Sequence, residues 1–112
     1  MEKILEICVD SLGSARAAIR GGADRLELCS ALAVGGLTPY EALLRQIRAE
    51  SDIPVRCLMR PRAGDFLYTP EEIDLMALLL CLLGWLLAPQ TLCSPSTTLG
   101  SFFLPNDSYF LN

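Results

Sequence analysis

The sequence has 112 residues, which is enough for one small domain and too few for two. Hydrophobic residues make up 52% of it, and this fraction excludes an intrinsically disordered chain. Nine basic and thirteen acidic residues give a formal net charge of -4 without a dense basic run, so we expect no nucleic-acid binding. Histidine is absent, and any chemistry must therefore use Cys, Asp, Glu, Arg, Ser or Tyr.

Residues 4–76 predict three strands that alternate with three helices. Short apolar segments place the strands at residues 4–9, 25–29 and 55–59. The helices follow the candidate N-caps, which are Asp10 or Ser11, then Thr38, then Thr69. Gly21–Gly22 ends the first helix, and Pro54 requires that the second helix ends before it. The order βαβαβα predicts an α/β fold with a parallel sheet and right-handed crossovers.

The charged residues stop almost completely after Asp74, because only Asp107 follows it. Residues 75–88 carry no charged or polar side chain, yet they fall short of the roughly 20 residues that span a membrane. We expect a hydrophobic, partly buried helix there, with shallow membrane association or aggregation as alternatives. Residues 89–112 are rich in Pro, Ser and Thr without periodicity, which predicts an irregular tail.

Side-chain alternation sorts the first two strands onto two faces. The face expected to meet the helices carries Leu5, Ile7, Val9, Leu26 and Leu28. The opposite face carries Glu6, Cys8, Asp10, Arg25, Glu27 and Cys29. Both faces of a parallel sheet are usually apolar. Charge on one of them is typical of a barrel interior, where polar side chains gather towards the carboxyl ends of the strands.

The second strand nearly repeats the first, because Leu5-Glu6-Ile7-Cys8 is followed by Leu26-Glu27-Leu28-Cys29. If the strands pair in the register that this repeat suggests, Cys8 and Cys29 lie close together, since neighbouring strands are about 4.8 Å apart. Two converging thiolates suit a soft ion such as Cu(I), whereas zinc takes a third and usually a fourth ligand. The alternative is that both cysteines only fill the core.

Buried carboxylates need partners, and the third strand ends in Arg60 and Arg62. A guanidinium pairs bidentately with a carboxylate or a phosphate, so these arginines predict either a self-satisfied network or an anion site. Arg60 is the nearest candidate counter-charge for Glu6 and Glu27. The candidate pocket residues are Glu6, Asp10, Glu27, Arg60, Arg62 and Asp65.

The five cysteines are an odd number at irregular spacings. The first ten residues contain both acidic and basic side chains and no long apolar stretch, so we expect no secretory signal. These features disfavour a disulfide framework and favour reduced thiols in the cytoplasm.

Three segments together resemble the CutC copper homeostasis family: LEICVDSLGSARAAIRGGADRLELCS, GGLTP and MRPRAGDFLYTPEEIDLM. The resemblance implies a TIM barrel, a cytoplasmic location, self-association and a role in copper tolerance or trafficking. The family's proposed copper-binding cysteines fall on Cys8 and Cys29. The family's polar pocket falls on Glu6, Glu27, Arg60, Arg62 and Asp65, and it has prompted the suggestion that members are enzymes.

A complete (β/α)₈ barrel needs about 250 residues. We therefore expect the N-terminal three βα units of an incomplete barrel in residues 1–76, followed by a tail outside the family in residues 77–112. This arrangement looks like a truncated product. The leading expectation is a copper homeostasis protein that binds Cu(I), and the alternatives are a partial barrel enzyme with an Arg/Glu anion pocket or an inactive fragment. The tail is expected to contact a membrane, a chaperone or a second copy of the chain.

Overall fold

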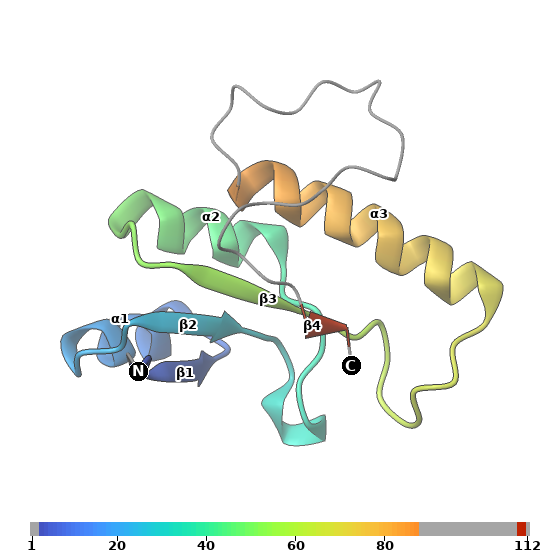
Figure 1. Ribbon diagram of the computed structural model, residues 1–112, viewed down its shortest axis with the longest axis horizontal. Helices are drawn as coiled ribbons and strands as arrows, with labels where there is room; N and C mark the ends of the chain where they lie inside the picture. The colour runs from blue at the N-terminus through green and yellow to red at the C-terminus, as the bar shows by residue number, and fades with distance from the viewer. Residues whose placement is uncertain (1–2, 88–109, 112) are drawn as a thin grey trace.

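A parallel β-sheet with its helices on one face forms the centre of the protein (Figure 1). The computed structural model describes residues 3–87 and 110–111. The strands are β1 (Glu6–Val9), β2 (Arg25–Leu28), β3 (Val55–Met59) and β4 (Phe110–Leu111), hydrogen-bonded in the order β1-β2-β3-β4. The helices are α1 (Leu12–Arg20), α2 (Glu41–Glu50) and α3 (Pro70–Leu87), and a short 3₁₀ helix, η1, spans Leu32–Val34. Contacts link α1 to β1 and α3 to β3, and α2 lies beside both other helices. The alternating α/β order predicted from the sequence is therefore present.

Two of the three predicted helix starts agree with the structure. Ser11 caps α1 in a capping box with Ser14, and Thr69 Oγ1 accepts a hydrogen bond from the Glu72 amide at the start of α3. The prediction for α2 was wrong, because this helix starts at Glu41. Thr38 instead accepts a hydrogen bond from the Arg60 amide at 2.9 Å. A tertiary contact thus takes the hydroxyl that the local pattern assigned to a cap.

The core lies between the sheet and the helices. The strands contribute buried side chains on alternate positions: Val9, Leu26, Leu28, Val55, Cys57 and Met59. The helices meet them with Ala15, Leu44, Ile47, Met76 and Leu83. The predicted apolar face is confirmed for Val9, Leu26 and Leu28, while Ile7 is partly buried against the core. Leu5 was wrongly predicted, because it precedes β1 and is exposed.

Helix α3 continues from its charged first turn through most of the uncharged segment (Figure 1). Leu83 faces the core and is 2% exposed, whereas Leu78 and Leu82 on the outer side are 64% and 56% exposed. One side of the helix therefore packs on the protein and the other meets solvent. Among the described residues, no helix combines the length and hydropathy that membrane spanning requires.

The end of the chain lies largely outside the described residues, and so does Cys93, the fifth cysteine. Within residues 110–111 the chain pairs with the end of β3, where Leu58 lies opposite Phe110. An irregular tail was expected, and these two residues differ from that expectation. The predicted domain boundary between residues 76 and 77 falls inside α3.

Candidate metal centre

Two thiols and one carboxylate converge on the face of the sheet opposite the helices. Cys8 of β1 and Cys29, which directly follows β2, place their Sγ atoms 3.4 Å apart. Together with a carboxylate oxygen of Glu27, these sulfur atoms form a group whose members all lie within 4.8 Å of one another. Within the described part of the chain, Cys8, Glu27 and Cys29 are the Cys, Asp or Glu side chains that lie close enough together, as a group of three, to hold one metal ion.

The register between β1 and β2 differs from the one that the sequence repeat suggested. Cys8 lies opposite Glu27, and Val9 lies opposite Leu28. Pairing of the repeats would have placed Cys8 opposite Cys29, so the prediction was wrong by two residues. Because side chains alternate with a period of two, a shift of two residues keeps both cysteines on the same face. The thiols therefore meet diagonally across the strand pair.

The two thiols differ in their access to solvent. Cys8 is exposed, whereas Cys29 is buried. Burial raises the pKa of the Cys8 thiol, and the carboxylates of Glu27 and Asp10 raise it further, while the hydrogen bond to Cys29 lowers it. Burial also raises the pKa of the Cys29 thiol, and its hydrogen bond with Cys8 adds to the effect. Both thiols consequently keep their protons at neutral pH.

Glu6 finds its partners at the amino end of the sheet. Its carboxylate forms an ion pair with the Arg25 guanidinium and lies 3.6 Å from Arg56 Nη1. The prediction that Arg60 would be the nearest counter-charge for Glu6 was wrong. Arg56 was missed as a candidate, although it lies in β3 opposite Glu27, on the face of the sheet away from the helices.

The Arg60 guanidinium is surrounded by main-chain carbonyl oxygens that accept its hydrogen bonds. Nη1 donates to the carbonyl oxygens of Val34 and Gly36 at 2.9 and 3.1 Å, and Nη2 donates to that of Gly64 at 3.0 Å. The residue is 8% exposed. These three bonds tie the loop after β2 to the loop after β3, so Arg60 stabilises the carboxyl edge of the sheet.

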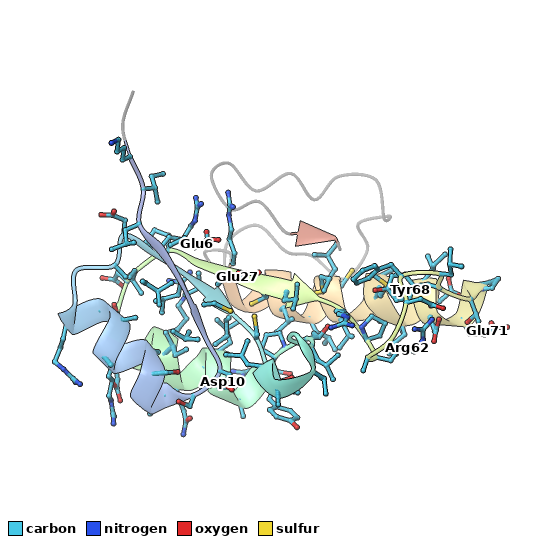
Figure 2. The ribbon with its side chains drawn as sticks, turned by 90° about the horizontal axis from the view of Figure 1, so that it is seen from below. Glu6, Asp10, Glu27, Arg62, Tyr68 and Glu71 are labelled. Carbon is cyan, nitrogen blue, oxygen red and sulfur yellow. The ribbon has the colours of Figure 1, made fainter. Side chains whose placement is uncertain are left out.

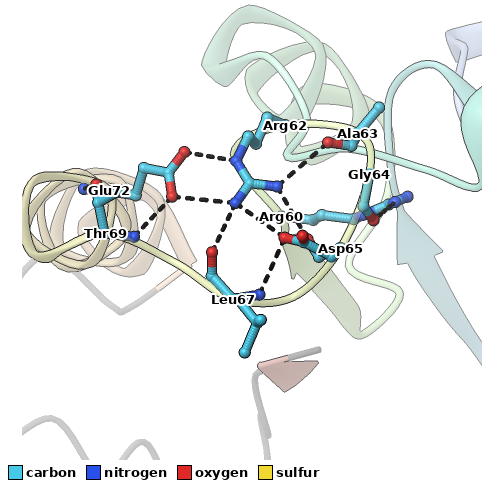
Figure 3. A network of polar contacts seen from close by, with 8 residues as sticks. All are labelled: Arg60, Arg62, Ala63, Gly64, Asp65, Leu67, Thr69 and Glu72. Carbon is cyan, nitrogen blue, oxygen red and sulfur yellow. Dashed lines mark hydrogen bonds and ion pairs between the residues drawn. The ribbon is translucent and has the colours of Figure 1, made fainter.

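Arg62 belongs to a partly exposed network at the start of α3 (Figure 3). Its Nε donates to Glu72 Oε1 at 2.5 Å, and its Nη2 donates to Asp65 Oδ1 at 3.2 Å. Further bonds reach the carbonyl oxygens of Asp65 and Leu67. This arginine holds the loop that leads into the helix.

The six predicted pocket residues do not form one cluster. Figure 2 shows Glu6 and Glu27 near each other, Asp10 at the far end of β1, and Arg62 well apart beside Tyr68. Carbonyl oxygens accept from Nη1 and Nη2 of Arg60, while its buried Nε has no hydrogen-bond partner among the described residues, and carboxylates accept from Arg62. The residues that the structure does bring together around the thiols are Cys8, Glu27 and Cys29.

The chain is similar to known proteins over most of its described residues. The profile of the CutC family matches residues 3–80. Over 72 residues the chain is 51% identical to the family protein CutC of Vibrio parahaemolyticus, which covers 64% of this chain and 29% of that protein. Over 73 residues it is 52% identical to the human protein named copper homeostasis protein cutC homolog, covering 65% of this chain and 27% of that one.

A solved structure gives the same result for the fold. The crystal structure of CutC from Streptococcus agalactiae is similar with a TM-score of 0.66 and 31% sequence identity, over 75% of this chain and 42% of that one. The protein is thus an α/β protein whose sheet and helices follow those of a CutC structure. The chain belongs to the CutC family, and it spans roughly 30% of the length of the curated relatives cited above.

Proposed function

We propose that this chain binds Cu(I) as its cargo through the thiolates of Cys8 and Cys29 and acts in copper homeostasis. The observation that carries the proposal is the 3.4 Å separation of the two sulfur atoms on one face of the sheet. Sulfur ligands select Cu(I), while the neighbouring carboxylate of Glu27 is a harder donor that suits this ion less well. The names of the relatives in the CutC family support the same conclusion.

The residues present fit a soft ion better than a structural zinc ion. A closed zinc site takes four ligands, commonly Cys and His, and this sequence has no histidine. Two thiolates with an open approach from the exposed Cys8 side suit a cargo that must be received and released. Metal binding would replace the two thiol protons that burial now retains.

The test is competition for Cu(I) between the purified full chain and a Cu(I) chelator of known affinity. We expect one tight site per chain, which both Cys8→Ser and Cys29→Ser weaken by at least about a hundredfold, since each removes one of two sulfur ligands. Cys81→Ser is the matched control, because Cys81 lies on α3, away from the pair. Equal affinity in the double variant Cys8→Ser, Cys29→Ser would refute the proposal.

We also infer that the described residues are the first three βα units of a TIM barrel with a hydrophobic third helix, in a cytoplasmic protein. The parallel order β1-β2-β3 and the likeness to CutC from Streptococcus agalactiae support the inference about the fold.

The exposed leucines on the outer side of α3 support self-association of the chain. Circular dichroism and thermal melting test whether the chain unfolds cooperatively, and analytical ultracentrifugation tests whether it associates. A non-cooperative melt would contradict an independently folded fragment, and a monomer in detergent-free buffer would contradict self-association.

A further inference from the structure

The loop after β2 forms one wall of the thiol site. Two main-chain bonds between Ser30 and Leu37 close the neck of this loop, and the Ser30 hydroxyl donates to the Thr38 carbonyl. Between them, Ala31, Gly35 and Gly36 have positive φ angles. A loop with three left-handed residues, one of them not glycine, needs outside contacts to keep its shape.

Gly36 brings this loop against the thiol site. A methyl group on Gly36 would lie 2.9 Å from Leu58 Cδ2 and 3.6 Å from Cys29 Sγ. The Gly36 backbone therefore lies within van der Waals contact distance of the buried sulfur, and a side chain there would collide with Leu58 and strain the positive φ angle of Gly36. Cys8 stays exposed on the other side of the pair.

Arg60 supplies the outside contacts that the loop needs. Its guanidinium bonds to the carbonyl oxygens of Val34 and Gly36, which lie on either side of Gly35, and its own amide and carbonyl both bond to Thr38 at the end of the loop. Phe66 covers the guanidinium from the next loop, with its ring centre 5.3 Å away. Arg60 thus holds the loop at Val34, Gly36 and Thr38.

We propose that Arg60 is a positioning residue for the thiol pair: it holds Gly36 over Cys29, so that metal reaches the site from the Cys8 side only. This proposal rests on the proposed function, because it assigns how the same site is shaped and entered. The Arg60 guanidinium donates its hydrogen bonds to carbonyl oxygens and to neither sulfur atom. Its effect on Cys29 is transmitted through the glycine turn.

The test measures the alkylation of individual cysteines in the metal-free full chain by mass spectrometry. Arg16 and Arg25 lie between Cys8 and Cys29, so trypsin separates the two cysteines into different peptides. Cys57 is the internal control, because it is buried in the core on the helix side of β3. Global unfolding exposes Cys57 together with Cys29, whereas release of the loop exposes Cys29 alone.

The variants are Arg60→Met, Arg60→Lys and Gly36→Ala, with Arg62→Met as the matched control. We expect Arg60→Met and Gly36→Ala to speed alkylation of Cys29 by about tenfold while Cys57 stays protected, since local opening then precedes global unfolding. Arg60→Lys keeps the charge without the planar fork and should give an intermediate rate. Arg62→Met removes a similar side chain that bonds to the helix start, and it should leave Cys29 unchanged.

Cu(I) competition on the same variants completes the test. A lost supporting contact typically weakens metal binding by about tenfold or more, and we expect this loss in Arg60→Met and not in Arg62→Met. If Cys29 stays as protected in Gly36→Ala and Arg60→Met as in the unsubstituted chain, or if Cys57 is alkylated in step with it, the proposal is overturned. If Arg60→Met does not fold, Gly36→Ala decides, because it retains Arg60. Failure of the unsubstituted chain to bind Cu(I) would refute the proposed function and would leave the alkylation result standing.

Discussion

The sulfur atoms of Cys8 and Cys29 lie 3.4 Å apart, although the residue opposite Cys8 in the sheet is Glu27. Val9 and Leu28, the buried register partners that adjoin the two cysteines, fix this stagger from the other face. The thiol pair is therefore positioned by the core of the protein. Such a site keeps its geometry better than one built on loops alone.

Glu27→Gln should distinguish a sulfur site from a mixed sulfur and carboxylate site. A carboxylate is a poor ligand for Cu(I), so we expect the affinity to fall by less than about tenfold, far less than in Cys29→Ser. Chelator competition measures both values. Glu41→Gln on the exposed side of α2 serves as the control. A loss in Glu27→Gln as large as that in Cys29→Ser would mean that the carboxylate is an essential ligand.

Glu6→Gln should destabilise the protein. Glu6 pairs with Arg25 and faces Arg56, and all three side chains are largely shielded from solvent. Neutralising the carboxylate leaves two neighbouring arginines with like charge, which should lower the free energy of unfolding by about 1–3 kcal/mol. Denaturant titration measures the change.

The control for Glu6→Gln is Glu41→Gln, which breaks an exposed pair with Arg45 on α2. Exposed pairs of this kind contribute less than about 1 kcal/mol. Equal effects of the two substitutions would show that the group of Glu6, Arg25 and Arg56 stabilises the protein no more than a surface ion pair does.

The alternation of strands and helices, the polar face of the sheet and the closeness of Cys8 and Cys29 could be predicted because they depend on local pattern. Alternation places Cys8 and Cys29 on one face whatever the register, provided that the shift is even. The partners of the charged groups could not be predicted, since they depend on that register. Arg25 lies opposite Glu6 only because β2 is displaced by two residues from the repeat.

Arg60 shows a second reason why the sequence was insufficient. Its three acceptors are main-chain carbonyls of residues 34, 36 and 64. Every residue type carries a main-chain carbonyl, so no sequence pattern could have indicated these partners. The Gly35–Gly36 pair was the sequence feature that could have indicated this contact. Two adjacent glycines permit the positive φ angles with which the loop presents its carbonyl oxygens to Arg60.

Glu72→Gln should remove a pH dependence of stability. Hydrogen bonds from Arg62 and from the Thr69 amide lower the pKa of the Glu72 carboxyl below its ordinary 4.5. Because the folded pKa is the lower one, the stabilisation is complete above pH 4.5 and is lost as the pH falls through the folded value. Melting temperatures of both chains should differ at neutral pH and converge in acid.

Glu71→Gln removes an exposed carboxylate from the same turn of α3 and is the control for this measurement. Its melting curve should follow that of the unsubstituted chain across the pH range. Parallel curves for Glu72→Gln and the unsubstituted chain down to acid pH would contradict the assigned role of the Arg62 pair.

Leu83→Ala and Leu78→Ala should separate the packed side of α3 from its outer side. Leu83 is 2% exposed, and its truncation should cost about 2–5 kcal/mol through lost burial and the remaining cavity. Leu78 is 64% exposed, so its truncation should change stability by less than about 0.5 kcal/mol. Denaturant unfolding of both variants measures the difference. Similar losses would mean that the outer side of α3 is also covered.

The stagger between β1 and β2 also bears on what oxidation can do to the thiol pair. A diagonal offset of two residues adds about 6.6 Å along the strands to about 4.8 Å across them, which separates the two Cα atoms by about 8 Å. Disulfide bonds rarely bridge Cα atoms more than about 6.8 Å apart. The sulfur atoms can therefore share an ion, but they cannot cross-link unless the sheet shifts. An oxidant from solution would then act on each thiol separately, and the exposed Cys8 would form a sulfenic acid or a mixed disulfide before the buried Cys29 reacts.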